Sequence, residues 1–525
     1  SYNVKWPIEK FEVKRNLENK KVINQNKNGI TILDKIICSG YFVMMLVIVG
    51  ICVFGSGIYY SRKTDTLLPE VVLLIVGYFS LLLLMMLVRK VNKVRMIDDR
   101  IIWICSIVFL VFQIYCVWNY YFLTDWDVKT VMNASIAAAN GADMEVFQSY
   151  FSIYPNNLFL VWIYGRLICF FQVIGLNYRM GILVCQCGLS WGTGIILYYV
   201  VKEITKNRCA SCFAWVIYLL LVGISPWVSI PYSDSMGLIF PIAILGVYIW
   251  SEKCLGKIRI YLWGVIGFLT IIGYHIKPQI TIVPIAIWIY VICLSFSKKK
   301  ELAYRISYFL VGCVAGVLIS SICINSLEIT IDENKTYGIS HFLMMGMNHS
   351  EGFEGNGVWN EDDVNFSASF DTAEERKKEN LCVFRERIRE MGIPGISNLM
   401  QRKTLTNYND GTFAWGWEGA FYVEKLSTKS NPLSEFLGNL YYNREWNGKY
   451  YKYFYNFELM IWLTVLFCTL LCVVQKKEMS FLGTVMLSII GLTVFELIFE
   501  ARARYLYTYI PMYIILASAS FPTKE

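Results

Sequence analysis

The sequence predicts an all-α polytopic membrane protein with about twelve membrane-spanning helices. Of its 525 residues, 56% are hydrophobic and only 17% are charged. The mean hydropathy of +0.46 is higher than a water-soluble domain normally reaches. Apolar runs of roughly 20 residues recur along the chain, and each is long enough to cross ~30 Å of hydrocarbon. Short basic segments separate these runs.

The elements follow from these runs in chain order. Residues 1–35 are polar and predict a cytoplasmic segment without a cleavable signal peptide. The predicted spanning helices are 36–60, 67–88, 100–122, 178–200, 209–229, 235–251, 258–275, 279–297, 303–325, 456–475, 479–499 and 503–519. The chain thus divides into a transmembrane region at 36–325, a polar segment at 326–455 and C-terminal helices at 456–525.

Five basic clusters predict the orientation, because Lys and Arg are enriched in cytoplasmic loops. They lie at 89–100, 202–208, 253–259, 298–305 and 476–477. All five fall on one side if the apolar stretch 157–174 lies flat at the outer interface, which Arg166 within it favours. We therefore expect a multi-pass plasma-membrane protein with both termini cytoplasmic. Arg62 and Lys63, in an outer turn, go against this pattern.

Two polar segments then face outside: the first outer loop, 123–177, and the segment 326–455. The second is rich in Gly, Asn, Trp and Tyr and contains a predicted helix near 373–392. A connector between helices needs far fewer residues. We expect an extracellular cap domain that is mixed α/β or irregular and that shapes a site or recognises an acceptor.

Composition also argues against several classes of function. The net charge of +8 is spread over loops between apolar runs, so nucleic-acid binding is not expected. The 16 cysteines lie mostly inside apolar runs and predict no disulfide framework, and Cys209 with Cys212 is an isolated CxxC pair. Three histidines make a zinc site improbable.

Asp125 and Asp127 lie where the third helix meets water, in Thr-Asp-Trp-Asp. They either end the helix as solvated groups or supply a partly desolvated base or cation ligand. Tyr154 and Asn156, in Tyr-Pro-Asn-Asn, can fold the loop over these acids.

Other polar groups are expected at the same face. Asp234 caps a helix or binds a ligand, and Lys277 occupies a tight outer turn. Arg502 and Arg504, followed by Tyr505, lie at an outer helix end, where cations are uncommon. Their position indicates an anionic partner such as a lipid phosphate.

The order of these motifs resembles the bacterial GT-C glycosyltransferases, in a Gram-positive group with Trp-Asp in the first outer loop followed by Tyr-Pro-Asn-Asn. The pieces that carry the resemblance are Trp126-Asp127, Tyr154 to Asn157, Pro231 to Asp234, Lys277-Pro278 and Arg502 to Tyr505. They extend in order from about residue 100 to 520, and the first two helices lie outside the resemblance.

The resemblance implies an inverting hexosyltransferase or pentosyltransferase that moves a sugar from a polyprenyl-phosphate donor to a cell-surface polysaccharide or glycolipid. Asp127 would be the catalytic base, with Asp125 kept open. The donor phosphate would be held by Arg502, Arg504, Tyr505 and Lys277. Sugar or acceptor would be bound by Asp234, Tyr232, Tyr154, Asn156, His349, Trp415, Trp417 and Glu418.

Three points stay open at this stage. The aromatic motifs of the cap suit sugar stacking, but they suit a folded core as well. No cofactor is required, and a divalent cation, Mg²⁺ or Mn²⁺, remains an option. The alternatives to an enzyme are a lipid-linked transporter or flippase, which should show internal repeats or broken helices at the midplane, and a non-catalytic protein of cell-wall assembly.

Overall fold

The computed structural model describes residues 32–55, 66–93, 98–120, 123–295, 299–418, 422–424, 431–442, 448–475 and 480–520. The long helices are α2 (Ile32–Gly50), α4 (Glu70–Lys93), α5 (Asp99–Tyr120), α6 (Trp126–Ala139), α8 (Leu158–Val173), α9 (Tyr178–Thr205), α10 (Arg208–Tyr218), α12 (Ile239–Lys253), α13 (Lys257–Ile276), α14 (Ile282–Ser295), α15 (Lys299–Asn325), α18 (Ala373–Tyr408), α21 (Tyr451–Val474) and α22 (Ser480–Ile498). The shorter helices are α7 (Gln148–Ile153), α11 (Ser233–Gly237), α16 (Gly338–Gly346), α17 (Glu361–Ala368), α19 (Trp415–Glu418), α20 (Pro432–Tyr441) and α23 (Ile510–Ala519). The strands are β1 (Leu123–Thr124) and β2 (Tyr422–Glu424), which pair antiparallel.

Ten helices in the described residues are long and apolar enough to cross a membrane. Nine of them overlap predicted segments, and the tenth is Pro155–Val173. The segments predicted at 209–229, 279–297 and 503–519 contain shorter helices instead: Arg208–Gly223, Pro278–Cys293 and α23. The chain is therefore an all-α, multi-pass integral membrane protein in its architecture, as predicted.

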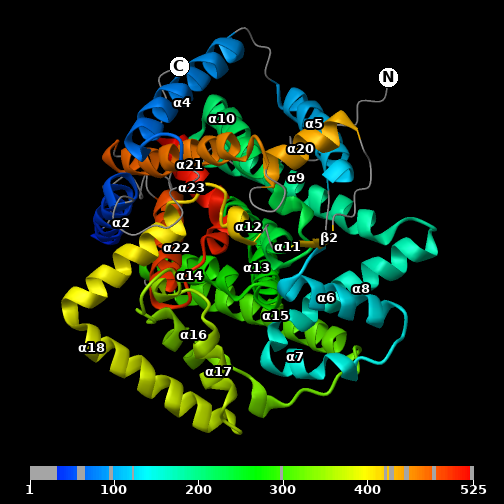
Figure 1. Cartoon of the computed structure of the whole chain (residues 1–525). Coiled ribbons are helices and arrows are strands. Elements are labelled where there is room, and N and C mark those ends of the chain that lie inside the picture. The colour runs from blue at the N-terminus through cyan, green and yellow to red at the C-terminus, as the bar shows by residue number, and fades with distance from the viewer. Residues whose placement is uncertain are drawn as a thin grey trace.

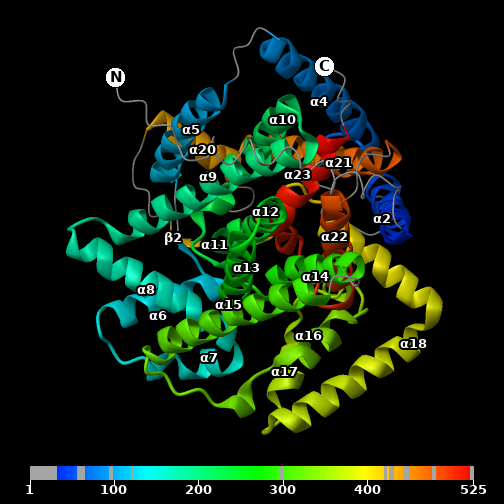
Figure 2. The same cartoon turned by 180° about the vertical axis from the view of Figure 1, so that it is seen from behind.

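The short helix α23 lies at the centre of the bundle, as the red helix in Figures 1 and 2 shows. Every residue from Ile510 to Ala519 is buried. The helix packs mainly against α21, α10, α22 and α9. Trp462 of α21 holds the ring of Tyr513 at a centroid distance of 5.1 Å. A helix that is surrounded by protein on all sides is expected to be apolar all round.

Ion pairs join the basic loops at one end of the bundle. Asp99, at the start of α5, pairs with Lys202 at the end of α9 (2.5 Å) and with Arg208 at the start of α10 (3.6 Å). Arg305 of α15 pairs with Glu252 of α12 at 2.8 Å, and Arg259 of α13 contacts the same acid at 2.8 Å. Four of the five predicted basic clusters thus meet at one end; Lys476 and Lys477 lie outside the described residues.

This arrangement bears on the segment 157–174. Because α5 leaves the basic end and α9 returns to it, the chain between them makes no net crossing of the bundle. By length and composition Pro155–Val173 is able to span. Its middle, however, lines the same cavity as Ser326 and Leu327, directly beyond the end of α15. The placement of this helix along the membrane surface stays a prediction.

Helices α13 and α15 approach each other very closely through glycines. A Cβ atom at Gly312 would lie 1.9 Å from the carbonyl oxygen of Gly264, and one at Gly267 would lie 2.1 Å from that of Phe309. The thiol of Cys313 donates to the Gly267 carbonyl at 3.6 Å. Small residues allow helix backbones to touch in this way inside a membrane.

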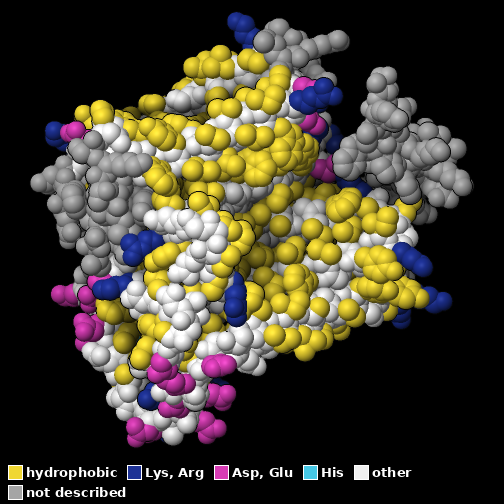
Figure 3. Space-filling model, turned by 90° about the vertical axis from the view of Figure 1, so that its right-hand side faces the viewer, with side chains coloured by type: hydrophobic (Ala, Val, Ile, Leu, Met, Phe, Trp, Pro, Cys, Tyr) yellow, Lys and Arg dark blue, Asp and Glu magenta, His cyan; other side chains and the backbone are white. Residues whose placement is uncertain are grey.

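The described part of 326–455 is largely helical, and its identity as an extracellular cap domain stays a prediction. It contains α16 to α20, and its strand β2 pairs with β1 of the first outer loop. The predicted helix 373–392 is the first half of α18, which bends at Gly392 (φ 56°) and continues to Tyr408. Acidic side chains gather at the lower end of the face in Figure 3, where α17 and the start of α18 lie, whereas hydrophobic side chains cover much of the remainder.

Candidate functional site

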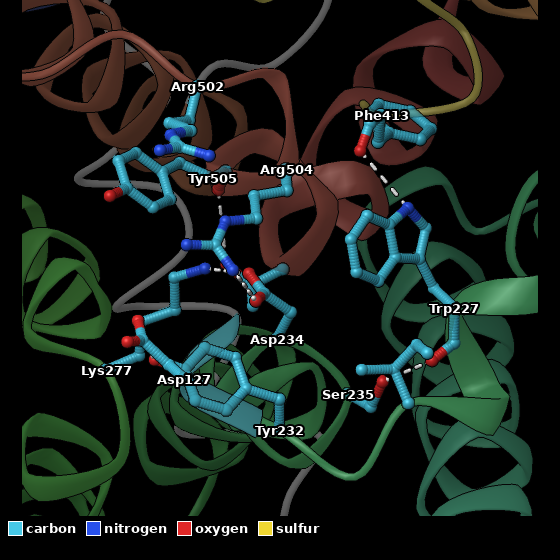
Figure 4. Close-up of polar contacts among 12 residues, drawn as sticks. Asp127, Trp227, Tyr232, Asp234, Ser235, Lys277, Phe413, Arg502, Arg504 and Tyr505 are labelled. Carbon is cyan, nitrogen blue, oxygen red and sulfur yellow. Dashed lines mark hydrogen bonds and ion pairs between the residues drawn. The ribbon is translucent and has the colours of Figure 1, made fainter. Parts of the chain in front are cut away.

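Four segments that begin or end helices meet at the end of the bundle opposite the ion-paired basic loops (Figure 4). Asp127 belongs to the first turn of α6, and Asp234 belongs to the short helix α11. Lys277 directly follows α13, and Arg504 belongs to the 3₁₀ segment Ala503–Tyr509 that leads into α23. Of the predicted site residues, these four are brought together with Tyr232 and Tyr505.

One carboxylate faces two cations at the centre of this cluster. Asp234, Lys277 and Arg504 are only 1%, 4% and 7% exposed. The Lys277 ammonium contacts Oδ1 of Asp234, and Nη1 of Arg504 lies 3.6 Å from Oδ2. Burial lowers the pKa of Lys277, while the Asp234 carboxylate acts in the opposite direction. The three groups together carry an excess positive charge when all are ionised.

Aromatic rings frame both cations. The Arg504 guanidinium carbon lies 4.6 Å from the ring centroid of Trp126 and 5.6 Å from that of Tyr232. Lys277 Nζ lies 4.8 Å from the centroid of the Tyr505 ring. The rings of Trp126 and Tyr232 contact each other edge to face at 5.0 Å. Such rings stabilise a desolvated cation and restrict its direction.

Asp127 is linked to this cluster and Asp125 is not. The Tyr232 hydroxyl donates to Oδ2 of Asp127 at 3.2 Å. Burial, followed by the charge of Asp127, raises the pKa of Tyr150, so this phenol lies close to the same carboxylate. Asp125 is exposed and pairs with Lys129 at 3.0 Å. The geometry thus favours Asp127 over Asp125 as the functional acid.

Arg502 and Tyr505 share a second acid that sequence reasoning missed. Arg502 Nε donates to Oε1 of Glu500 at 2.9 Å, and the Tyr505 hydroxyl donates to Oε2 at 3.1 Å. Glu500 is 6% exposed. Glu500 lies two residues before Arg502 in the sequence. An acid so close to two arginines was a signal that could have identified it.

The cap also holds the segment that carries the arginines. Lys403 of α18 donates to the carbonyl oxygens of Gly346 (2.8 Å) and Phe499 (2.5 Å). Burial lowers the pKa of Lys403 to about 7. The backbone NH of Ala501 donates to the carbonyl of Gly357 at 2.8 Å. No local sequence pattern marked Lys403, because it lies in a helix whose first half is highly charged and exposed.

The Gly411 to Glu418 motif has a structural role in its described part. The Trp227 indole donates to the carbonyls of Thr412 and Phe413, both at 3.1 Å, and Ser235 donates to the Trp227 carbonyl at 2.7 Å (Figure 4). Trp415 is 1% exposed and donates to the Tyr441 carbonyl at 2.9 Å. These contacts hold the loop that presents Asp234, and Trp415 is part of the core.

Of the remaining predicted residues, Tyr154 lies near Asp127, whose charge contributes, after burial, to the raised pKa of the Tyr154 phenol. Tyr154 packs against Tyr150 (5.4 Å), whereas Asn156 is exposed and its neighbour Asn157 donates to the Tyr150 hydroxyl at 3.0 Å. His349 contacts the Met347 carbonyl within the cap. The side chains of Trp417 and Glu418 lie outside the described residues. Among the described residues, no group of three or more His, Cys, Asp or Glu side chains is arranged to hold a metal ion.

The comparisons with known proteins concern the whole chain. Residues 23–524 match the model of a family described as "Conserved hypothetical integral membrane protein". No curated protein matches the chain, and no solved structure does.

Proposed function

The chain belongs to the family of conserved hypothetical integral membrane proteins, and we propose that it is an inverting GT-C glycosyltransferase. It would move a sugar from a polyprenyl-phosphate donor to a cell-surface polysaccharide or glycolipid. The reaction would take place on the outer face of the plasma membrane, at the end of the bundle that carries Asp127 and Arg504.

The observation that carries this proposal is the link between an acid and a buried cationic centre. Tyr232 donates to Asp127 and also lies against the guanidinium of Arg504. Lys277 and Arg504 both contact the carboxylate of Asp234. A phosphate placed here would receive charge-assisted hydrogen bonds from groups that are already oriented and desolvated.

The chemistry that suits this arrangement is displacement at the anomeric carbon. Asp127 would take the proton of the acceptor hydroxyl as its oxygen forms a bond to that carbon. The bond from the carbon to the lipid phosphate oxygen would break, and its electron pair would leave with the phosphate. Attack from the opposite face inverts the configuration. Lys277 and Arg504 would stabilise the departing phosphate.

Replacing Asp127 tests this role. We expect Asp127→Asn to lower sugar transfer by about 10²- to 10⁴-fold, because the base is lost while the shape of the side chain is kept. The measurement is transfer of radiolabelled sugar from polyprenyl phosphate to host cell-surface glycan by the detergent-purified chain. Asp125→Asn is the matched control, since this exposed acid pairs with Lys129, and it should stay within about twofold of the unmodified protein. Full turnover by Asp127→Asn would refute the assignment.

A lipid-linked transporter is the second candidate. It is favoured by Glu458 of α21 and Glu496 of α22, two acids within apolar helices that are only 1% and 0% exposed. Ionisable groups inside spanning helices often mark ion pathways. Sugar transfer by protein in detergent, without any gradient, would favour the enzyme over this alternative.

A further inference from the structure

A cavity of about 380 Å³ lies apart from the cluster around Asp234. Its walls are the end of α6, the middle of α8 and residues 326–328, which follow α15. Ala138 is the first α6 residue in the wall, eleven residues beyond Asp127. Eleven helical residues correspond to about 17 Å. The cavity is therefore a second site and not an extension of the first.

Charges of both signs line this cavity. Arg166, Asp143 and Glu328 all contribute to its wall. Among the described residues no ion pair within 4.0 Å joins Arg166 to either acid; its guanidinium lies 5.7 Å from the centroid of the Trp162 ring. A purely anionic ligand would meet two acids here, and a purely cationic ligand would meet an arginine. The wall is complementary to a ligand that carries both charges.

An apolar path leads along α15 to the cavity. Val311, Val314, Leu318 and Ile322 recur every three or four residues, and 57% to 68% of each side chain is exposed. This spacing places them on one face of the helix. α15 is long and apolar enough to span the membrane, so this face contacts lipid chains. Ser326, in the cavity wall, follows Ile322 by one helical turn.

We propose that this cavity binds the headgroup of a zwitterionic phospholipid with a primary ammonium group. Arg166 holds the phosphate, and Asp143 and Glu328 accept hydrogen bonds from the ammonium. The acyl chains lie along Val311, Val314, Leu318 and Ile322 of α15. The assignment does not depend on sugar transfer.

Native mass spectrometry of the delipidated full chain in detergent tests this site. The probes are equimolar dioleoyl phosphatidylethanolamine, phosphatidylcholine and phosphatidylglycerol, which share their acyl chains. We expect phosphatidylethanolamine to be retained roughly fivefold to tenfold more than phosphatidylglycerol, since contacts to exposed charges such as Asp143 and Glu328 add only modest selectivity each. Phosphatidylcholine should fall between them, because its quaternary ammonium donates no hydrogen bond.

Variants separate the headgroup contacts from general lipid binding. Arg166→Gln should lower retention of all three lipids, because it removes the contact to the phosphate that they share. Glu328→Gln, in an exposed loop, should reduce retention of phosphatidylethanolamine but not of phosphatidylglycerol. Arg179→Gln is the matched control, because Arg179 also lies over an aromatic ring, that of Tyr178 at 5.9 Å, but does not line the cavity. Equal retention of the three lipids, stronger retention of phosphatidylglycerol, or unchanged retention in Arg166→Gln would overturn the proposal.

The failure of this inference is distinguishable from failure of the proposed function. Asp127→Asn should retain phosphatidylethanolamine like the unmodified chain, because Asp127 is not part of the cavity wall. An inactive Asp127→Asn protein with normal lipid selectivity would support both assignments. Loss of lipid retention in Arg166→Gln with normal sugar transfer would support the lipid site alone.

Discussion

Asp234 balances two buried cations, so its removal should cost more than removal of either partner. In Asp234→Asn, Lys277 and Arg504 would face each other without a carboxylate between them. Breaking such a buried network typically costs about 3 to 5 kcal/mol. Lys277→Met should cost less, because Asp234 keeps Arg504. Thermal unfolding in detergent should give Asp234→Asn a lower melting temperature than Lys277→Met. A lower melting temperature for Lys277→Met would show that Lys277 does not depend on Asp234.

His341 should make the protein sensitive to acid. It is 1% exposed, Nδ1 lies 2.7 Å from the Ser367 hydroxyl oxygen, and burial lowers its pKa from 6.5 to about 4. Between these pH values the unfolded chain binds a proton that the folded chain does not. The stability from this group is therefore complete above about pH 6.5 and lost as the pH falls to about 4, by roughly 3 kcal/mol.

The variant His341→Asn tests this linkage. Asn keeps a polar atom near Ser367 but does not titrate in this range. The melting temperature should fall less between pH 7 and pH 4.5 in His341→Asn than in the unmodified protein. An identical fall in both proteins would assign the acid sensitivity to other groups.

At the scale of single residues, the sequence located the charged groups but not their partners. Asp127, Asp234, Lys277 and Arg504 could be recognised because each is polar beside an apolar run. The contact between Asp234 and Lys277 joins residues 43 positions apart, which no local pattern encodes. Lys403 was missed for a related reason, since its burial depends on Gly346 and Phe499, far away in the chain.

Among the elements, the contact of α13 with α15 depends on the absence of side chains. Gly312→Ala would place a methyl group within 1.9 Å of the Gly264 carbonyl, so the two backbones must separate. We expect a clear loss of melting temperature in detergent. Gly40→Ala in α2 is the matched control, because nothing lies within 4 Å of its added Cβ. That variant should be neutral or slightly stabilised, since Ala favours helix over Gly. Equal melting temperatures of Gly312→Ala and Gly40→Ala would argue against close packing of α13 with α15.

Helix positions were largely predictable, because an apolar run that is long enough to span the membrane has few structures open to it other than a spanning helix. The exceptions have physical causes. α23 is short because it is enclosed by other helices and need not reach lipid on its own. In the cap, the helix near 373–392 was predicted but its continuation to Tyr408 was not, because the bend at Gly392 interrupts the pattern.

For the whole molecule, orientation remains a prediction that native cysteines can test. Cys382 is exposed on α18 in the predicted extracellular cap. Cys254 lies between α12 and α13, next to the ion-paired basic end. A membrane-impermeant maleimide added to intact cells should label Cys382, and Cys382→Ser should remove that labelling. Cys254 should react only after permeabilisation. Labelling of Cys254 in intact cells would reverse the orientation.

The central position of α23 has a consequence for biosynthesis. This helix emerges from the ribosome after every other described helix, yet α9, α10, α21 and α22 pack around it. The preceding segment supplies Arg504, so the cationic centre is incomplete until then. The helices α9, α10, α21 and α22 are therefore synthesised before the helix that they enclose. Asp234 and Lys277 are thus made long before Arg504, the second cation that Asp234 contacts.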